Sequence, residues 1–338
     1  MKHQGALKRG ILIFVIAATF ITVAAAAGTA ALKNWRPLKE KGSAPETASK
    51  TSSTEDFSNF LLCGIDNTNS LTDVIMVANF DSKNHKLTLL QIPRDTYVSG
   101  DVPSHKYNAV YSHHDKNVSG METLKAQIEN DFGITIDHYA AVTTKGFRKI
   151  VDAVGGVDID VPINMNYDDD EQDLHIHLKK GLQHLNGAKA EQFVRYRKGW
   201  SQGDLGRLNA QRIFLAALMQ KIKSMSAWEI GTKIVPVVSA PNFLTDLSGY
   251  QMLEFYNLAK DINLSDAAVY TMPGEPFSLD GVDYYSVHKD ELLEILNAHF
   301  VPEGTELSIY DLKIVQMADS VKTDENADDF ENILSGNR

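Results

Sequence analysis

The stretch Phe60-Leu-Leu-Cys-Gly-Ile-Asp66 decides the fold, because it is a short, continuous apolar run that ends in a carboxylate. Such a run is typical of a strand buried on both faces of a sheet. Two more strands are predicted at Asp73 to Phe80 and Lys86 to Ile92, with turn residues 81–84 between them and Pro93 at the end. The three segments predict an antiparallel hairpin beside a central strand.

Helices alternate with strands further along the chain. Ser119 and Glu122 form a predicted capping box for a helix to Phe132, with Gly133 as its C-cap. A β-α-β pattern follows, with a strand at His138 to Val142, a helix at Phe147 to Val154 and a strand at Val157 to Val161. Beyond it we expect a helix with Asn186 as its cap, a long helix from Asp204 to Lys223, and further helices in the region 235–312. This alternation predicts an α/β sandwich, a mixed β-sheet flanked by helices.

The ends of the chain differ in composition from its body. Residues 1–10 carry Lys2, Lys8 and Arg9, and residues 11–32 have no charge, which predicts a cytoplasmic N-terminus and one transmembrane anchor. A cleaved signal peptide is the alternative, because small residues follow the apolar run. Residues 33–58 read as a flexible linker, 59–315 as one folded domain, and 316–338 as a disordered tail.

The composition excludes several classes of function. The chain has 338 residues and a formal net charge of -11, which argues against general nucleic-acid binding. Its single cysteine, Cys63, lies in the apolar run and reads as a core residue. An internal disulfide and a thiolate zinc site are therefore excluded.

The stretch from Arg195 to Gln211 is polar where a helix should turn apolar. Asp204, Arg207 and Gln211 fall on the same helical face as the apolar residues Leu215, Leu218 and Ile222. Burial of such polar groups without partners costs several kcal/mol, roughly 2 to 7 each. The alternative is a solvated surface helix, but three polar residues in register with the core face favour a polar pocket. Arg195 and Arg197 add two cations that can each bind an oxyanion through a planar fork.

Four short constellations together point to phosphate chemistry. They are Asp66, Thr72-Asp73, Ile92-Pro-Arg-Asp95 and the Arg195 to Gln211 stretch. Carboxylates hold a magnesium ion that bridges phosphate oxygens, and guanidinium groups neutralise the remaining charge. Singly, each constellation has a purely structural explanation, such as a turn cap or a local ion pair.

The order of these motifs closely resembles the LytR-CpsA-Psr family. The resemblance covers roughly residues 60–223 and extends more loosely to about 312. The motifs that carry it are Leu61 to Asp66, Leu71 to Met76, Gln91 to Val98, Lys106 to Ala109, Ile136 to Tyr139, Val151 to Asp158, Gly181 to Gly187, Val194 to Arg197, and Gly203 to Arg207 with Gln211.

The resemblance implies a membrane-anchored phosphotransferase at the cell membrane, with a single membrane pass and its catalytic domain outside the cell. Members of the family transfer a glycopolymer, such as teichoic acid or capsule, from a polyprenyl pyrophosphate carrier to peptidoglycan. The implied cofactor is Mg2+, with Mn2+ as its substitute. The implied partners are the lipid-linked glycopolymer, peptidoglycan and the membrane, and no nucleic acid.

The family's site residues carry over to matching positions in this chain. Asp66 and Asp73 match the metal-associated carboxylates. The pyrophosphate-binding set matches Arg94, Lys106, Arg195, Arg197, Arg207 and Gln211. Arg94, Asp95 and Asp204 are the implied catalytic residues, and either Asp95, Asp204 or a metal-bound group takes the acceptor proton.

The chain departs from the family pattern at its second motif. The family often has Arg-Ser-Asp-Thr where this chain has Leu71-Thr-Asp-Val74. Loss of one cation near the phosphates predicts weaker donor binding, by roughly 1.5 to 3 kcal/mol. Two other functions therefore stay open: a polyprenyl pyrophosphate hydrolase, and a non-catalytic cell-wall regulator that binds polyprenyl phosphate.

Overall fold

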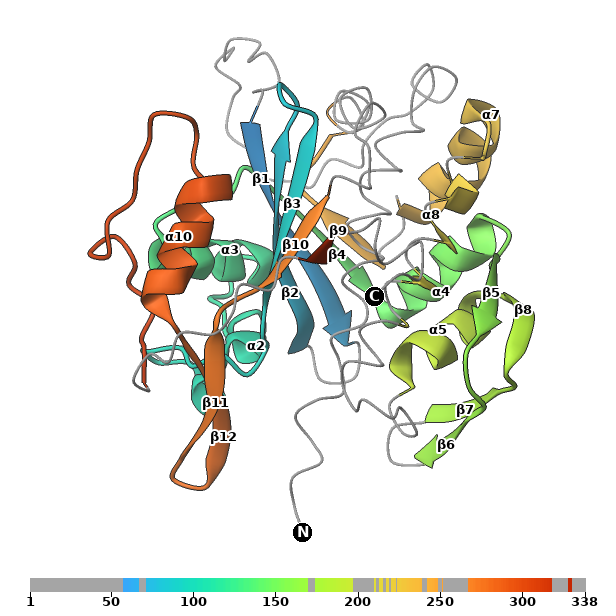
Figure 1. The fold of residues 1–338 in the computed structure, drawn as a ribbon, viewed down its shortest axis with the longest axis horizontal. Coiled ribbons are helices and arrows are strands. Elements are labelled where there is room, and N and C mark those ends of the chain that lie inside the picture. The colour runs from blue at the N-terminus through green and yellow to red at the C-terminus, as the bar shows by residue number, and fades with distance from the viewer. Residues whose placement is uncertain are drawn as a thin grey trace.

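The computed structural model describes residues 57–66, 71–169, 174–196, 267–317 and 328–329, together with parts of the region 210–251. It is a mixed α/β fold in which helices cover both faces of a central sheet (Figure 1). Within the described residues, none of the helices has the length and apolar character that a membrane crossing requires. The predicted anchor at residues 11–32 lies outside the described residues.

The central sheet has seven strands in the order β13-β10-β3-β2-β1-β4-β9. The predicted hairpin is confirmed, because β2 is antiparallel to both β1 and β3. Strand β4 is parallel to β1, and β10 is parallel to β3. The strands are β1 (Phe57–Asp66), β2 (Leu71–Asp81), β3 (Lys86–Ile92), β4 (His138–Thr143), β9 (Phe243–Thr245), β10 (Ala268–Thr271) and β13 (Asp328–Asp329). The C-terminal ends of β1, β3, β4 and β10 therefore meet at one edge, called here the carboxyl edge.

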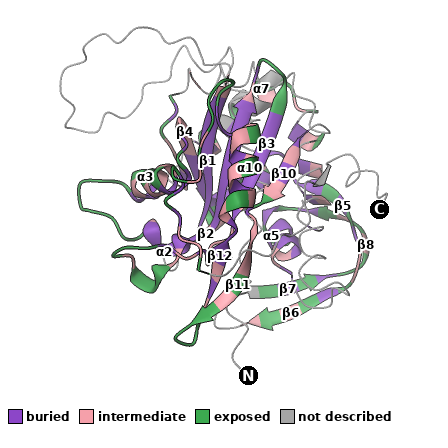
Figure 2. Ribbon diagram, turned by 60° about the vertical axis from the view of Figure 1, so that its left-hand side comes forward, coloured by how far each residue is buried: buried purple, intermediate pink, exposed green. Residues whose placement is uncertain are grey.

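Alternation along the buried strands divides the core into two apolar clusters, one on each face of the sheet. Phe60 and Leu62 of β1 pack into one cluster, and Leu61 and Cys63 pack into the other. The first face is covered by α4 (Thr144–Ala153), α5 (Gly187–Arg195) and α8 (Val235–Val238), and the second by α2 (Tyr107–Val110), α3 (Gly120–Phe132) and α10 (Lys289–His299). Figure 2 shows the buried sheet between these two layers.

Local signals placed the ends of α3 correctly. The Ser119 hydroxyl oxygen accepts a hydrogen bond from the Glu122 backbone N–H at 3.1 Å, which confirms the N-cap. Gly133 ends the helix with φ of 69°, the left-handed conformation that glycine adopts without steric cost. The predicted cap of α5 is also confirmed, since the Asn186 side chain accepts from the Lys189 backbone N–H at 3.0 Å.

The last strand of the predicted β-α-β pattern is confirmed with its predicted bounds, but it is not in the central sheet. Strand β5 (Val157–Val161) pairs with β8 (Gly181–Leu185) in a separate antiparallel sheet, next to the hairpin of β6 (Met165–Asp169) and β7 (Leu174–Leu178). The alternating burial of β5 is typical of a strand with one solvated face, whereas a strand inside the sheet is buried on both.

The region 235–312 was also predicted too helical. Its one long described helix is α10, which contains the apolar residues at 292–296 that indicated it. The other described elements are mostly strands, because β9, β10 and the hairpin of β11 (Gly274–Leu279) and β12 (Val282–Val287) lie here, with α7 (Ala227–Glu229) and η3 (Ile230–Ile234) just before them. In the segment predicted as a tail, Asp328 and Asp329 pair with β10.

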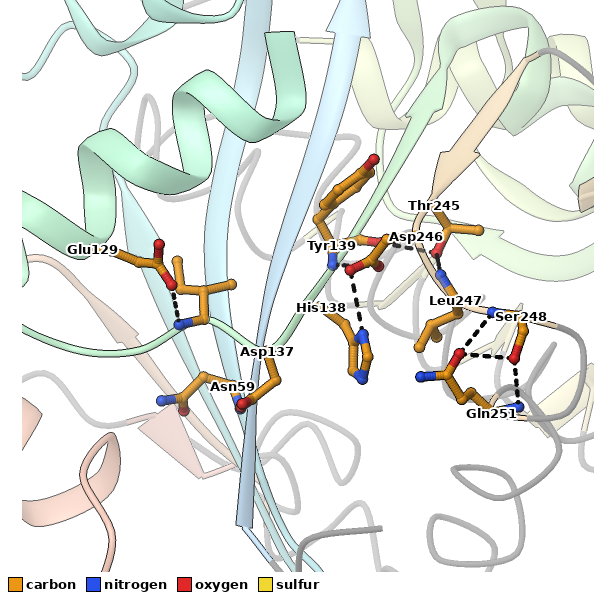
Figure 3. A network of polar contacts seen from close by, with 11 residues as sticks. Asn59, Glu129, Asp137, His138, Tyr139, Thr245, Asp246, Leu247, Ser248 and Gln251 are labelled. Carbon is orange, nitrogen blue, oxygen red and sulfur yellow. Dashed lines mark hydrogen bonds and ion pairs between the residues drawn. The ribbon is translucent and has the colours of Figure 1, made fainter. Parts of the chain in front are cut away.

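A polar network at the opposite edge holds β4 between β1 and β9 (Figure 3). The Asp137 carboxylate accepts from the Asn59 backbone N–H at 2.8 Å, and the Asp246 carboxylate accepts from the Tyr139 backbone N–H at 2.9 Å. Asn59 and Asp66 stand seven positions apart on β1, about 23 Å at the usual rise of a strand. This network therefore supports the sheet, and the carboxyl edge is left for the site.

Candidate functional site

Asp73 lies at an irregularity in the pairing of β1 with β2. Gly64 pairs with Val74 and Ile65 pairs with Thr72, so Asp73 is an extra residue on β2. A β-bulge of this kind redirects a side chain and disturbs the alternation of faces. The Thr72 hydroxyl donates to the backbone oxygen of Asn108 in α2 at 3.4 Å, which anchors the strand beside the bulge.

Four charged side chains converge next to this bulge and form what we call the ion cluster: Asp73, Arg94, Asp95 and Lys106. Arg94 Nη1 donates to Asp73 Oδ1 at 3.1 Å, and Arg94 Nε lies 3.5 Å from Asp95 Oδ2. Lys106 Nζ donates to Asp95 Oδ1 at 2.9 Å. The four side chains are only 11% to 17% exposed, so their charges are less screened than surface ion pairs.

The backbone after β3 fixes the position of Arg94. Pro93 ends the strand, and its carbonyl oxygen accepts from the Thr96 hydroxyl at 2.6 Å and from the Thr96 N–H at 3.0 Å. The Arg94 carbonyl oxygen accepts from the Asn108 N–H at 3.1 Å. This tight turn brings the arginine and Asp95 to the carboxyl edge, as a catalytic or binding group on a rigid scaffold requires.

Asp66 reaches the same edge by a different route. It is the last residue of β1, and its backbone pairs with Leu71, two positions before Asp73. Its side chain lies outside the described residues. The predicted neighbourhood of Asp66 and Asp73 is therefore confirmed for the backbone, and their shared role in metal binding stays a prediction.

Arg195 lies at the end of α5 and belongs to a second group of charges. Arg195 Nη1 donates to Glu191 Oε1 at 2.6 Å, and Arg148 Nε of α4 donates to Glu191 Oε2. Glu191 is almost fully buried, with 4% of its side chain exposed, so two guanidinium groups neutralise one buried carboxylate. Helices α4 and α5 approach closely here, and only glycine fits at position 187. A Cβ at Gly187 would lie 2.2 Å from the Arg148 carbonyl oxygen.

Replacing Glu191 with Gln should lower the free energy of unfolding by about 1.5 to 3 kcal/mol, the range for a hydrogen bond to a charged group. The neutral amide loses the charge that both guanidinium groups contact. Denaturant unfolding of the purified protein measures the change. Glu303→Gln is the matched control, because its ion pair with Lys83 is exposed and should contribute less than about 0.5 kcal/mol. Equal losses for the two variants would contradict the structural role of Glu191.

Four predicted site residues, Arg197, Asp204, Arg207 and Gln211, lie outside the described residues. Their convergence with the ion cluster stays a prediction. The apolar end of their helical face is confirmed, since Leu218 and Ile222 are buried in the same apolar cluster as Phe193 of α5.

The sequence predictions missed Glu191 and Arg148, the residues that share the second group of charges with Arg195. Glu191 stands four residues before Arg195, and this spacing on a helix is a known signal for an ion pair. Arg148 is 43 positions away from Glu191 and gives no local signal. Cys63 behaves as predicted: it is fully buried, and burial raises the pKa of its thiol well above the usual range, so it is not a nucleophile.

The oxygen ligands at the carboxyl edge fit a magnesium ion whose remaining ligands come from substrate phosphates and water. Among the described residues, no group of three or more His, Cys, Asp or Glu side chains forms a ready-made metal site. Magnesium commonly binds through one or two carboxylates together with substrate phosphates and water. Asp73 offers a hard oxygen ligand of this kind, and the backbone of Asp66 ends the neighbouring strand.

Comparisons with known proteins agree with this geometry. A model of the LytR_cpsA_psr family matches residues 21–300 of the chain. The polyisoprenyl-teichoic acid–peptidoglycan teichoic acid transferase TagU of Bacillus anthracis is 33% identical over 275 residues, which is 78% of this chain and 86% of TagU. The Bacillus subtilis transferase TagV is 38% identical over 160 residues, 46% of this chain and 40% of TagV.

The fold is also that of a solved relative. The crystal structure of B. subtilis TagV aligns with a TM-score of 0.57 and 28% sequence identity, and the alignment covers 73% of this chain and 98% of the TagV chain. The mixed sheet and its helical layers are therefore shared with TagV.

Proposed function

Because the chain belongs to the LytR_cpsA_psr family, we propose that it is a phosphotransferase that moves a glycopolymer, such as teichoic acid or capsule, from a polyprenyl pyrophosphate carrier to peptidoglycan. Its relatives TagU and TagV are named as transferases of polyisoprenyl-linked teichoic acid to peptidoglycan. The observation that carries the proposal is the ion cluster, two cations and two carboxylates gathered at the carboxyl edge.

The reaction replaces a phosphoanhydride bond of the donor with a phosphodiester bond to the acceptor. The acceptor hydroxyl oxygen attacks the phosphorus that carries the glycopolymer, a new P–O bond forms, and the P–O bond to the polyprenyl phosphate breaks. The hydroxyl proton passes to a carboxylate of the protein. Arg94 and Lys106 bring positive charge to the phosphate oxygens, where charge develops in the transition state. In this proposal Arg195, Arg197, Arg207 and Gln211 bind the pyrophosphate.

Asp66 and Asp73 would hold the Mg2+ ion of the proposed reaction. When bound, the ion supplies charge neutralisation on the phosphate oxygens. Arg94 donates to Asp73 Oδ1 and so holds this carboxylate in place, and Asp66 ends the neighbouring strand. Mn2+ has the same preference for carboxylate oxygen and is expected to substitute for Mg2+.

Replacing Asp73 with Asn should raise the Mg2+ concentration needed for half-maximal transfer by about ten- to a hundredfold. The amide keeps an oxygen that accepts from Arg94 but loses the negative charge that attracts the ion. Titration of Mg2+ in the transfer reaction and in donor binding measures the shift. Asp158→Asn is the control, since Asp158 lies in the separate β5–β8 sheet. An unchanged Mg2+ requirement for Asp73→Asn would remove this residue from the metal site.

The proposed location follows from the N-terminal sequence. Residues 11–32 would cross the membrane once and leave the catalytic domain outside the cell, where peptidoglycan is. A protease added to intact cells should then cut the folded domain. Cleavage that occurs only after the cells are broken would contradict the proposed orientation.

The test of the function uses the purified protein in detergent with a polyprenyl pyrophosphate-linked glycopolymer, Mg2+ and a peptidoglycan oligomer. A coupled glycopolymer–peptidoglycan product is expected. Release of the polymer phosphate to water alone would identify a hydrolase, and tight lipid binding with no product would identify a non-catalytic regulator. Either of these two results overturns the proposed transfer.

A further inference from the structure

Beside the ion cluster lies a group of aromatic rings that the proposed reaction does not use. We call it the aromatic platform, and it consists of Tyr97, His105, Phe277 and Tyr284. The Tyr97 and His105 rings stack with centroids 5.7 Å apart, and the Phe277 and Tyr284 rings stack at 5.5 Å. Tyr97 meets Tyr284 edge-on at 5.4 Å and Phe277 at 6.3 Å, so the four rings form one continuous group.

Three of the four rings reach the surface. Tyr284 is buried beneath the group, Tyr97 and Phe277 are half-buried, and His105 is exposed. The β11–β12 hairpin that carries Phe277 and Tyr284 projects from the body of the protein, with an exposed tip (Figures 1 and 2). Aromatic side chains at a protein surface are typical of binding sites, since a ring offers apolar contact area at little cost in side-chain entropy.

The loop that carries His105 has an unusual backbone. The short helical turn η1 (Pro103–His105) contains two successive non-glycine residues with positive φ, Ser104 at 61° and His105 at 49°. Such conformations cost free energy and cluster at ligand-binding sites. The conformation brings the His105 ring against Tyr97.

The platform is joined to the ion cluster by the backbone. The Tyr285 N–H donates to the Asp95 carbonyl oxygen at 2.9 Å, and the Tyr97 N–H donates to the Tyr285 carbonyl oxygen at 3.0 Å. Lys106 Nζ lies 5.3 Å from the centroid of the Tyr284 ring, within range of a cation–π interaction. The platform therefore lies next to Asp95 and Lys106 of the ion cluster.

The charge of the hairpin decides which ligand fits. Residues 274–287 contain the acidic residues Glu275, Asp280 and Asp283 and neither Lys nor Arg. Glu275 lies on the same face of β11 as Phe277, and Lys106, which lies over the Tyr284 ring, is already paired with Asp95. A teichoic acid with a phosphate in each repeat, or an anionic lipid surface, is therefore disfavoured here. A glycan strand has no phosphate and is repelled less, its apolar C–H faces contact the negative faces of aromatic rings, and its hydroxyls bond to carboxylates such as that of Glu275.

We propose that the aromatic platform binds the glycan strand of peptidoglycan and presents its acceptor hydroxyl to the ion cluster. The role of the glycan strand as acceptor rests on the proposed transfer, but binding of the strand to the platform does not depend on the reaction. Each six-residue strand of the hairpin spans about 20 Å, which is enough for several sugar rings in a row.

The test is binding of the full-length protein in detergent to peptide-free glycan strands prepared from peptidoglycan. Phe277→Ala should weaken binding about three- to tenfold, the range for loss of one aromatic contact. Phe277→Trp keeps an aromatic face and should restore binding. Trp228→Ala is the matched control, because Trp228 is an aromatic residue that is 69% exposed on α7, away from the hairpin, and its loss should leave binding unchanged.

Purified teichoic acid and vesicles of phosphatidylglycerol and phosphatidylcholine serve as competing probes. Equal glycan binding by Phe277→Ala and the unaltered protein would overturn the proposal, as would loss of teichoic acid or vesicle binding in place of glycan binding. In the transfer reaction, Phe277→Ala should raise KM for the acceptor more than it changes kcat. If no transfer is seen but Phe277→Ala still loses glycan binding, the proposed function is wrong and the proposed glycan binding by the platform is supported.

Discussion

Replacing Arg94 with Ala should lower the rate of glycopolymer transfer by about a hundred- to a thousandfold, the usual effect of removing one preorganised group that stabilises transition-state charge. Arg94 is the centre of the ion cluster, since its guanidinium contacts Asp73 through Nη1 and Asp95 through Nε. Its loss removes a cation from the phosphates and leaves two carboxylates close together at the carboxyl edge. The measurement is kcat/KM for the coupled product.

The control variants separate charge from geometry. Arg94→Lys keeps the cation but loses the planar fork, so we expect it to recover part of the rate. Lys83→Ala removes an exposed lysine that pairs with Glu303, and it should change nothing. Denaturant unfolding of each variant shows whether it is folded. Unchanged turnover in folded Arg94→Ala would show that the ion cluster is not the site of transfer.

The sequence predicted the central part of the fold well because the signals there are local. An apolar run, a turn and Pro93 define β1 to β3, and a serine cap with a C-terminal glycine defines α3. The role of β5 was predicted wrongly, since pairing with β8 depends on contacts between residues about 20 to 30 positions apart. The β11–β12 hairpin was missed for a related reason: its position beside Asp95 depends on backbone hydrogen bonds between residues 190 positions apart.

The site was predictable to a similar degree. The turn after β3 brings Arg94 and Asp95 together, and this part follows from sequence order. The contact of Arg94 with Asp73 depends on the register of the hairpin and on the bulge at Asp73. No sequence pattern predicted this bulge. Glu191 has a helical spacing signal, but its burial between two arginines is a property of the packing of α4 against α5.

The identity of the base that takes the acceptor proton can be decided by comparing Asp95→Asn with Asp204→Asn. If Asp95 is the base, Asp95→Asn should lower kcat by about a hundred- to ten-thousandfold, the range for loss of general base catalysis. Asn keeps an oxygen that accepts from Lys106, so the cluster should stay assembled and donor binding should be retained.

Geometry favours Asp95 among the described residues. Its carboxylate contacts both Lys106 and Arg94, and its carbonyl oxygen is bonded to the hairpin of the aromatic platform, so acceptor and donor sites would meet at this residue. Asp101→Asn, on the exposed loop nearby, is the control and should keep the full kcat. A rate retained in Asp95→Asn and lost in Asp204→Asn would instead assign proton transfer to Asp204.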